Sequence, residues 1–156
     1  MAYRISRNIE ASLVDFITAE LITPWGTGIT VLKGFPQDYK GKAPFIGIEA
    51  LEIRPQKLEI GSKINLKYFT VKIRIVAKND GQRLDLSDWL FDLLEDDVNY
   101  YIHTITNGVS SKGITPDGRI VITRWNENRK ELQNTEVLES EDRYRQVFVF
   151  ECIVAI

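Results

Sequence analysis

The sequence has very few of the side chains that metal centres and nucleophilic sites require. Its 156 residues include one cysteine, Cys152, and one histidine, His103. A single cysteine cannot form an internal disulfide, and one cysteine with one distant histidine cannot supply a cysteine–histidine zinc site. Because Cys152 lies inside an apolar strand pattern, we interpret it as a small buried hydrophobic residue and not as a nucleophile. Such cysteine usage predicts a protein made in a reducing cytoplasm.

Long apolar runs and clusters of positive charge are also missing. No stretch approaches the roughly 18 consecutive apolar residues of a membrane span, and no secretion signal follows Met1. We therefore expect neither membrane insertion nor secretion. The formal net charge is −2, and no Lys/Arg cluster of the kind that holds duplex phosphates is present. Nucleic acid is therefore not expected to be the main ligand.

The sequence signatures of catalysis are absent as well. Gly26, Gly28 and Gly34 are not followed by a Gly-Lys-Ser/Thr sequence, so there is no P-loop. A catalytic triad would have to use His103, at the predicted end of a helix. The commoner reason for a histidine there is a favourable interaction with the helix dipole. We predict that the protein is not an enzyme and needs no cofactor or metal.

What the sequence does contain is one long alternating stretch that leads into a helix. From Ile64 to Lys78, apolar and polar residues alternate with a period of two, which predicts a strand with one solvent-exposed face. A turn signal follows at Asn79-Asp80-Gly81, and the leucines of Leu84–Tyr101 then recur with a helical period. The alternation changes phase at Tyr68–Phe69, which predicts a β-bulge in this strand.

Further elements flank this stretch. Ile5–Ile22 predicts an amphipathic helix, with Asn8 and Asp15 on its polar face. Polar connections are predicted at Phe35–Ala43, His103–Gly118 and Asn126–Asp142, and further strands at Gly28–Gly34, Phe45–Ile53, Arg119–Trp125 and Tyr144–Ile156. The last strand is apolar on both faces, so it must be central in the sheet or covered by another chain.

These elements predict one domain over residues 1–156, which is an ordinary length for a single core. We expect an α+β fold. In this fold a mainly antiparallel sheet of about five strands would carry two helices on one face, with a β-arm and long loops.

Two features of the connections indicate contacts outside the domain. Leu58 and Ile60 are apolar residues between two predicted strands, where a turn would normally be polar, and a protruding β-arm would account for them. Trp125 lies at the mouth of a charged loop. It is either a core residue or a contact residue, since tryptophan is enriched at partner surfaces.

A row of carboxylates is the one unusual chemical feature. Asp88, Asp92 and Asp96 recur every four residues on one face of the second predicted helix, where each like-charged pair costs about 0.2–0.5 kcal/mol. Three interpretations stay open. The row is a solvated face, a charged subunit contact or pore lining, or an acidic site for a metal or for acid–base chemistry.

Several local sequences occur in an order that resembles a known family. They are the amphipathic N-terminal helix, the Trp-Gly-x-Gly-Ile turn at 25–29, Ala43–Ile48, the long strand leading into Leu84–Leu90, and the terminal strand. This order resembles the tail-terminator (tail-completion) and neck proteins of tailed bacteriophages, over nearly the whole chain.

The resemblance implies a small virion subunit that forms a ring, usually a hexamer, on the end of the tail tube. Such a ring stops tube growth and offers a surface to the head connector, while DNA passes through its lumen without specific binding. The family has no catalytic residues and no contact motif to carry over. The candidate contact residues therefore rest on the sequence pattern alone; they are Leu58, Ile60, Asp88, Asp92, Asp96 and Trp125.

Three alternatives remain. The first is another structural protein of the same kind of virion, for head completion or for the baseplate. The second, from a different class, is a small ligand-binding domain or enzyme that uses the acidic helix face or His103. The third is a cellular adaptor domain.

Overall fold

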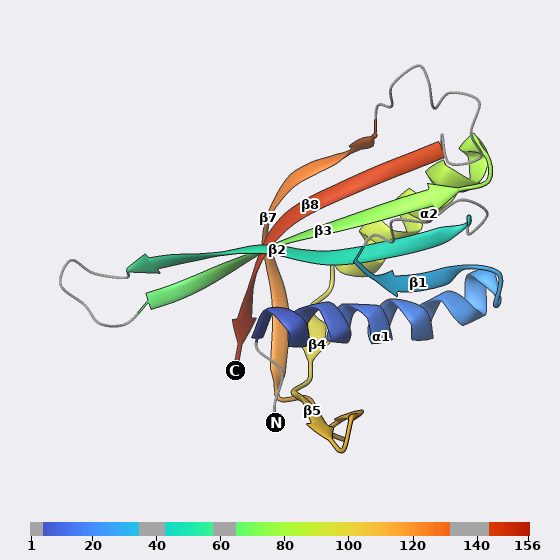
Figure 1. Cartoon of the computed structure of the whole chain (residues 1–156). Coiled ribbons are helices and arrows are strands. Elements are labelled where there is room, and N and C mark those ends of the chain that lie inside the picture. Colours follow the sequence, from blue (N-terminus) through green and yellow to red (C-terminus); the bar gives the residue numbers. More distant parts are fainter. Residues whose placement is uncertain (1–4, 35–42, 58–64, 132–143) are drawn as a thin grey trace.

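The computed structural model describes residues 5–34, 43–57, 65–131 and 144–156 (Figure 1). The contact residues Leu58 and Ile60 therefore lie outside the described residues, as does the predicted connection Phe35–Ala43 except for Ala43. Along the chain the elements are α1 (Ile5–Trp25), β1 (Thr30–Lys33), β2 (Phe45–Lys57), β3 (Asn65–Ala77), α2 (Asp80–Leu94), β4 (Val98–Tyr100), β5 (His103–Thr106), β6 (Val109–Lys112), β7 (Gly118–Lys130) and β8 (Tyr144–Ala155).

The strands form one large curled sheet and one small sheet. Six strands lie in the order β1-β2-β3-β8-β7-β4, and β5 and β6 form a separate hairpin. All neighbouring pairs are antiparallel except β1 and β2. The predicted α+β class with a mainly antiparallel sheet is confirmed, with one more strand in the main sheet than expected.

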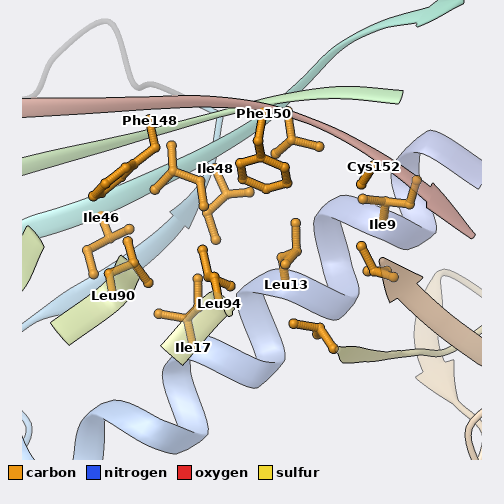
Figure 2. Packing of buried hydrophobic residues seen from close by; sticks show 14 of the residues in the cluster. Ile9, Leu13, Ile17, Ile46, Ile48, Leu90, Leu94, Phe148, Phe150 and Cys152 are labelled. Atoms are coloured by element: carbon orange, nitrogen blue, oxygen red, sulfur yellow. The ribbon is translucent and has the colours of Figure 1, made fainter. Parts of the chain in front are cut away.

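Both helices pack on the same face of the main sheet. The core joins α1 residues such as Leu13 and Ile17 to Leu90 and Leu94 of α2 and to Phe148 of β8 (Figure 2). The α1 residues recur every three or four positions, so they form one apolar stripe along the helix. α1 ends at Trp25, three residues beyond the predicted end at Ile22. Gly26 follows with a φ of 71°, and its N–H donates to the Ile22 carbonyl.

The strand that is apolar on both faces is central in the sheet, which is one of the two placements that the sequence leaves open. β8 pairs with β3 on one side and with β7 on the other. Phe148 and Phe150 on its inner face are fully buried in the core, and Val147 on the outer face is only 2% exposed. The register places Arg74 and Arg129 on either side of Val147. Long side chains on neighbouring strands can cover such an outer-face residue with their aliphatic parts.

The second helix is shorter than the sequence pattern indicates. It ends at Leu94, not Tyr101, and Val98–Tyr100 forms β4 beside β7. Glu95, Asp96 and Asp97 follow the last turn, and negative charge is unfavourable at the C-terminal end of a helix dipole. The chain leaves the helix at these carboxylates, so the predicted placement of Asp96, Tyr101 and His103 on or at the end of this helix is wrong.

The predicted bulge in the long strand is also wrong. β3 pairs without interruption with β8 from Phe69 to Ala77, and the register shift lies across from it on β2, at Leu51. The phase change in the sequence has another cause. Tyr68 lies on the outer face of the sheet, where the Arg54 guanidinium stands 4.8 Å from its ring centroid. At this point an aromatic residue therefore stands on the face that carries polar residues further along the strand, and the alternation changes phase without a bulge.

Two predicted loops contain strands. His103–Lys112 forms the β5–β6 hairpin, whose two turn residues, Asn107 and Gly108, have φ values of 52° and 78°. Asn-Gly is the strongest short hairpin signal because it tolerates positive φ at both positions. β7 continues through Asn126 to Lys130, where it pairs with Gln146, so the predicted connection from Asn126 begins too early.

The β-arm is present up to the edge of the described residues. β2 and β3 remain paired as far as Lys57 and Asn65, and together they extend past the other strands (Figure 1). β1 pairs with β2 only over Phe45–Ile48. Within the described residues, the outer part of β2 therefore has β3 as its only strand partner, and its Leu51 and Ile53 side chains are about half exposed.

Candidate functional site

A pocket lies in a groove between α1 and the β5–β6 hairpin. Its volume is about 430 Å³. Ala11, Asp15 and Thr18 of α1 form one wall, Lys112 of β6 lies opposite, and Lys33 of β1 lines it as well. Small and hydroxyl-bearing side chains leave the space between these charged groups open. We take this groove, named the hairpin groove below, as the candidate binding site.

A row of polar residues on α1 positions one side of the hairpin groove. Asn8 and Ser12 are one helical turn apart and almost fully buried. The Asn8 side-chain amide donates to the Tyr100 hydroxyl over 3.1 Å, and its oxygen accepts from the His103 main-chain N–H over 3.0 Å. The Ser12 hydroxyl oxygen accepts from the main-chain N–H of Tyr101 over 3.1 Å. These bonds hold the start of the hairpin against the helix.

His103 is an anchor of the hairpin in this arrangement. The residue is 5% exposed, with its Nε2 atom 3.3 Å from the Asp15 carboxylate and its Nδ1 atom 3.1 Å from the Tyr101 carbonyl oxygen. A catalytic triad needs a hydroxyl or thiol at the ring nitrogen that does not face the carboxylate. That nitrogen faces a main-chain carbonyl oxygen, which is not a nucleophile. The Asp15–His103 pair therefore joins two elements and does not form a triad.

The lysines give the hairpin groove a positive balance. The Lys112 ammonium lies 3.9 Å from the Asp15 carboxylate and 4.7 Å from the Tyr101 ring centroid, and both charged side chains are nearly half exposed. With Lys33 as a second ammonium, the groove holds two lysines and one carboxylate among its described lining residues. Charged groups this exposed can reorient, so the groove is suited to an anionic group brought by another molecule.

The four predicted contact residues that the structure describes do not line the hairpin groove. Asp88 and Asp92 are exposed on α2, and Asp96 is exposed just after its end. Among the residues that the structure describes, no cluster of three or more His, Cys, Asp or Glu side chains could hold a metal ion.

Trp125 lies at the edge of the core. It is half-buried on β7, and its ring centroid is 4.9 Å from that of Phe91, 6.1 Å from Phe148 and 5.1 Å from Phe150. Aromatic pairs in this distance range stabilise a fold beyond the area that they bury. The packing accounts for the tryptophan and leaves only part of its surface for a partner.

Burial also fixes the ionisation of the Tyr100 hydroxyl. Its removal from water raises the pKa, the hydrogen bond from Asn8 acts in the opposite direction, and the nearby Asp117 carboxylate raises it further. The hydroxyl therefore stays neutral, and it accepts the Asn8 hydrogen bond without carrying a buried charge.

Known proteins offer no guide to this groove. No family model and no curated protein matches the chain. Among the described helices, none is both long and apolar enough to cross a bilayer. The described residues must therefore indicate the function on their own.

Cys152 is expected to be unreactive in the folded protein. The residue is fully buried, and burial raises the pKa of its thiol to about 12, so almost no thiolate exists at pH 8. We expect iodoacetamide to modify Cys152 far more slowly in native protein than in guanidinium chloride, as followed by intact mass. A cysteine introduced in Val109→Cys, at a position 67% exposed, should react rapidly in the native state.

The same shift has a consequence for stability in alkali. In an unfolded chain the thiol has its ordinary pKa of 9.0, whereas in the folded chain the pKa is about 12. Above pH 9 the folded state binds more protons than the unfolded state, so the free energy of unfolding declines as the pH rises.

In the labelling experiment, rapid modification of the native protein at pH 8 would contradict the buried position of Cys152.

Proposed function

We propose that the protein is a structural subunit of the tail terminator ring of a tailed bacteriophage. In this role identical copies close into a ring, expected to be a hexamer, that caps the tail tube and ends its polymerisation. The ring then joins the tail to the head connector or neck, and DNA passes through its lumen. The subunit acts in the virion and carries out no reaction.

The observation that carries this proposal is the β2–β3 arm. It extends past the other strands (Figure 1), and at its base, where β1 no longer pairs with β2, Leu51 and Ile53 are 49% and 51% exposed. Large apolar side chains on a strand edge are suited to pairing with another protein surface. Together with the resemblance in the order of elements, this favours a protein that works by assembly.

The hairpin groove gives weaker support to a small ligand-binding domain or enzyme. Its only histidine, His103, is occupied by Asp15 and by a main-chain carbonyl. The acidic residues of α2 do not line the groove. The structural role is therefore the better supported of the two classes.

The test is assembly of the purified protein, measured by mass photometry and by electron microscopy with tail tubes. We expect closed rings, in solution or on the tube tips. Replacing both residues at the base of the arm, Leu51→Ser with Ile53→Ser, should weaken assembly or tube binding, because it removes the exposed apolar side chains there. A permanent monomer with no affinity for tail tubes would overturn the proposal.

A matched control is provided by α1. Ile22 is 59% exposed on this helix, away from the arm, so Ile22→Ser removes a similar exposed apolar side chain and should leave assembly unchanged.

Electron microscopy also distinguishes the tail terminator from the other structural proteins of the virion. Attachment at the distal end of the tail would indicate a baseplate protein, and attachment to heads alone would indicate a head-completion protein.

A further inference from the structure

The charges of the chain are strongly segregated. The 18 residues 80–97, which cover α2 and the turn after it, contain seven carboxylates and one arginine. They carry a net charge of −6, so the other 138 residues carry +4 in a chain of net charge −2. An acidic helix on an otherwise positive molecule favours attraction between one copy and a different surface of the next.

The acidic surface of α2 is open to such a contact. Asp85, Asp88 and Asp92 are all exposed, and their spacing places Asp88 and Asp92 one turn apart on the same face. Their mutual repulsion disfavours the helix in an isolated chain. A positively charged partner would relieve that repulsion.

The hairpin groove has the complementary features. Lys33 and Lys112 both line it, and small or hydroxyl-bearing residues such as Ala11, Thr18 and Ser111 leave room for an incoming side chain. Asp15 is the one opposing charge among the described lining residues, and it already faces His103 at 3.3 Å and Lys112 at 3.9 Å.

The two surfaces cannot meet within one molecule. The β5–β6 hairpin projects below α1, whereas α2 lies well away from it, behind β3 (Figure 1). A contact between different surfaces of two copies is heterologous, and its repetition produces a ring or a filament. A self-complementary dimer would instead pair identical surfaces.

We infer that the hairpin groove of one copy binds the acidic face of α2 of a second copy, with Lys33 and Lys112 facing Asp88 and Asp92. This inference rests on the proposed assembly function and names one of its contacts. Each exposed ion pair contributes little alone, but the like-charged arrangement that a variant would create is strongly unfavourable. The contact sets the orientation of neighbouring copies, and salt weakens it.

Charge reversal on each surface provides the test. A groove variant carries Lys33→Glu with Lys112→Glu, and a helix variant carries Asp88→Lys with Asp92→Lys. In a head-to-tail assembly each variant places like charges at every contact, so self-association measured by sedimentation velocity should fall roughly tenfold or more. Mixing the two variants should restore association, because each then presents the charge that the other needs.

The mixing step distinguishes the contact from a loss of folding. Unfolded variants could not rescue one another, so recovery in the mixture requires both to be folded. A control with the same charge change at exposed sites outside the groove, Lys78→Glu with Lys130→Glu, should associate as the original protein does.

Three results would overturn the inference. They are unchanged association of either variant, equal loss in the control, and no recovery on mixing when circular dichroism shows both variants folded. In each case rings of the unmodified protein would leave the proposed function standing. If the unmodified protein never associates, with or without tail tubes, the proposed function and this contact both fail.

Discussion

Replacing Phe150 by alanine should lower the free energy of unfolding by about 3–5 kcal/mol, the usual cost of removing a fully buried phenylalanine. Phe150 is 0% exposed in the centre of β8, between Val71 of β3 and Trp125 of β7. Removal of the ring leaves a cavity lined by all three strands, and close packing prevents its complete collapse. Denaturant unfolding should show a lower midpoint with an unchanged slope.

The control for this prediction is Ile114→Ala, at a fully exposed position. Its free energy of unfolding should stay within about 0.5 kcal/mol of the original value. If Phe150→Ala costs less than about 1 kcal/mol, β8 is not the central strand of the core.

The second large effect is expected for Asn8→Ala. This change removes the hydrogen bond to the Tyr100 hydroxyl and the acceptor of the His103 main-chain N–H, both in a buried region. Each buried polar group that loses its partner costs about 1–3 kcal/mol. The loss of stability should be greatest near β5, since these hydrogen bonds hold the hairpin against α1.

Hydrogen exchange distinguishes a local loosening of the hairpin from a general loss of stability. Amide exchange at His103 and along β5 should accelerate in Asn8→Ala by more than exchange along β3. Thr18→Ala, on the exposed part of the same helix, should have little effect because its hydroxyl donates to the Val14 carbonyl one turn earlier and not to the hairpin residues that the structure describes. Equal acceleration in β3 and β5 would contradict the anchoring role.

The sequence predicts the helices and strands that have one face buried in the core. α1, β3 and β8 are long enough to repeat their apolar period several times, and the burial of Leu13, Ile73 and Phe148 follows that period. The turn before α2 is also visible in the sequence, and the Asn79 side chain accepts the Gln82 N–H over 2.8 Å at the start of that helix. Periodicity is a reliable signal where one face meets a core.

Short or exposed strands leave no such signal. β4 has three residues, too few for its alternation to predict a strand, and every residue of β6 is exposed. The Asn107-Gly108 turn is the one indication of the β5–β6 hairpin in the sequence. The spacing of apolar residues alone does not reveal this turn.

The hairpin groove is not predictable from α1 alone. Asn8 and Asp15 belong to the face of the helix that sequence analysis assigns to solvent, yet Asn8 is 2% exposed. The segment that covers it, Tyr100–His103, is more than 90 residues further along the chain. A polar helix face gives no indication of which distant segment will pack on it, because hydrogen-bond partners follow from the tertiary fold.

The position of β8 has a consequence for synthesis on the ribosome. β8 follows every other described element in the chain, yet it separates β3 from β7 in the sheet. A nascent chain can pair β2 with β3 early, but β3 and β7 have no strand between them until the last strand emerges. During that interval both strands expose an edge and an apolar face, which makes the unfinished chain prone to aggregation. Protection of the growing polypeptide by a chaperone would matter most just before translation of this strand is complete.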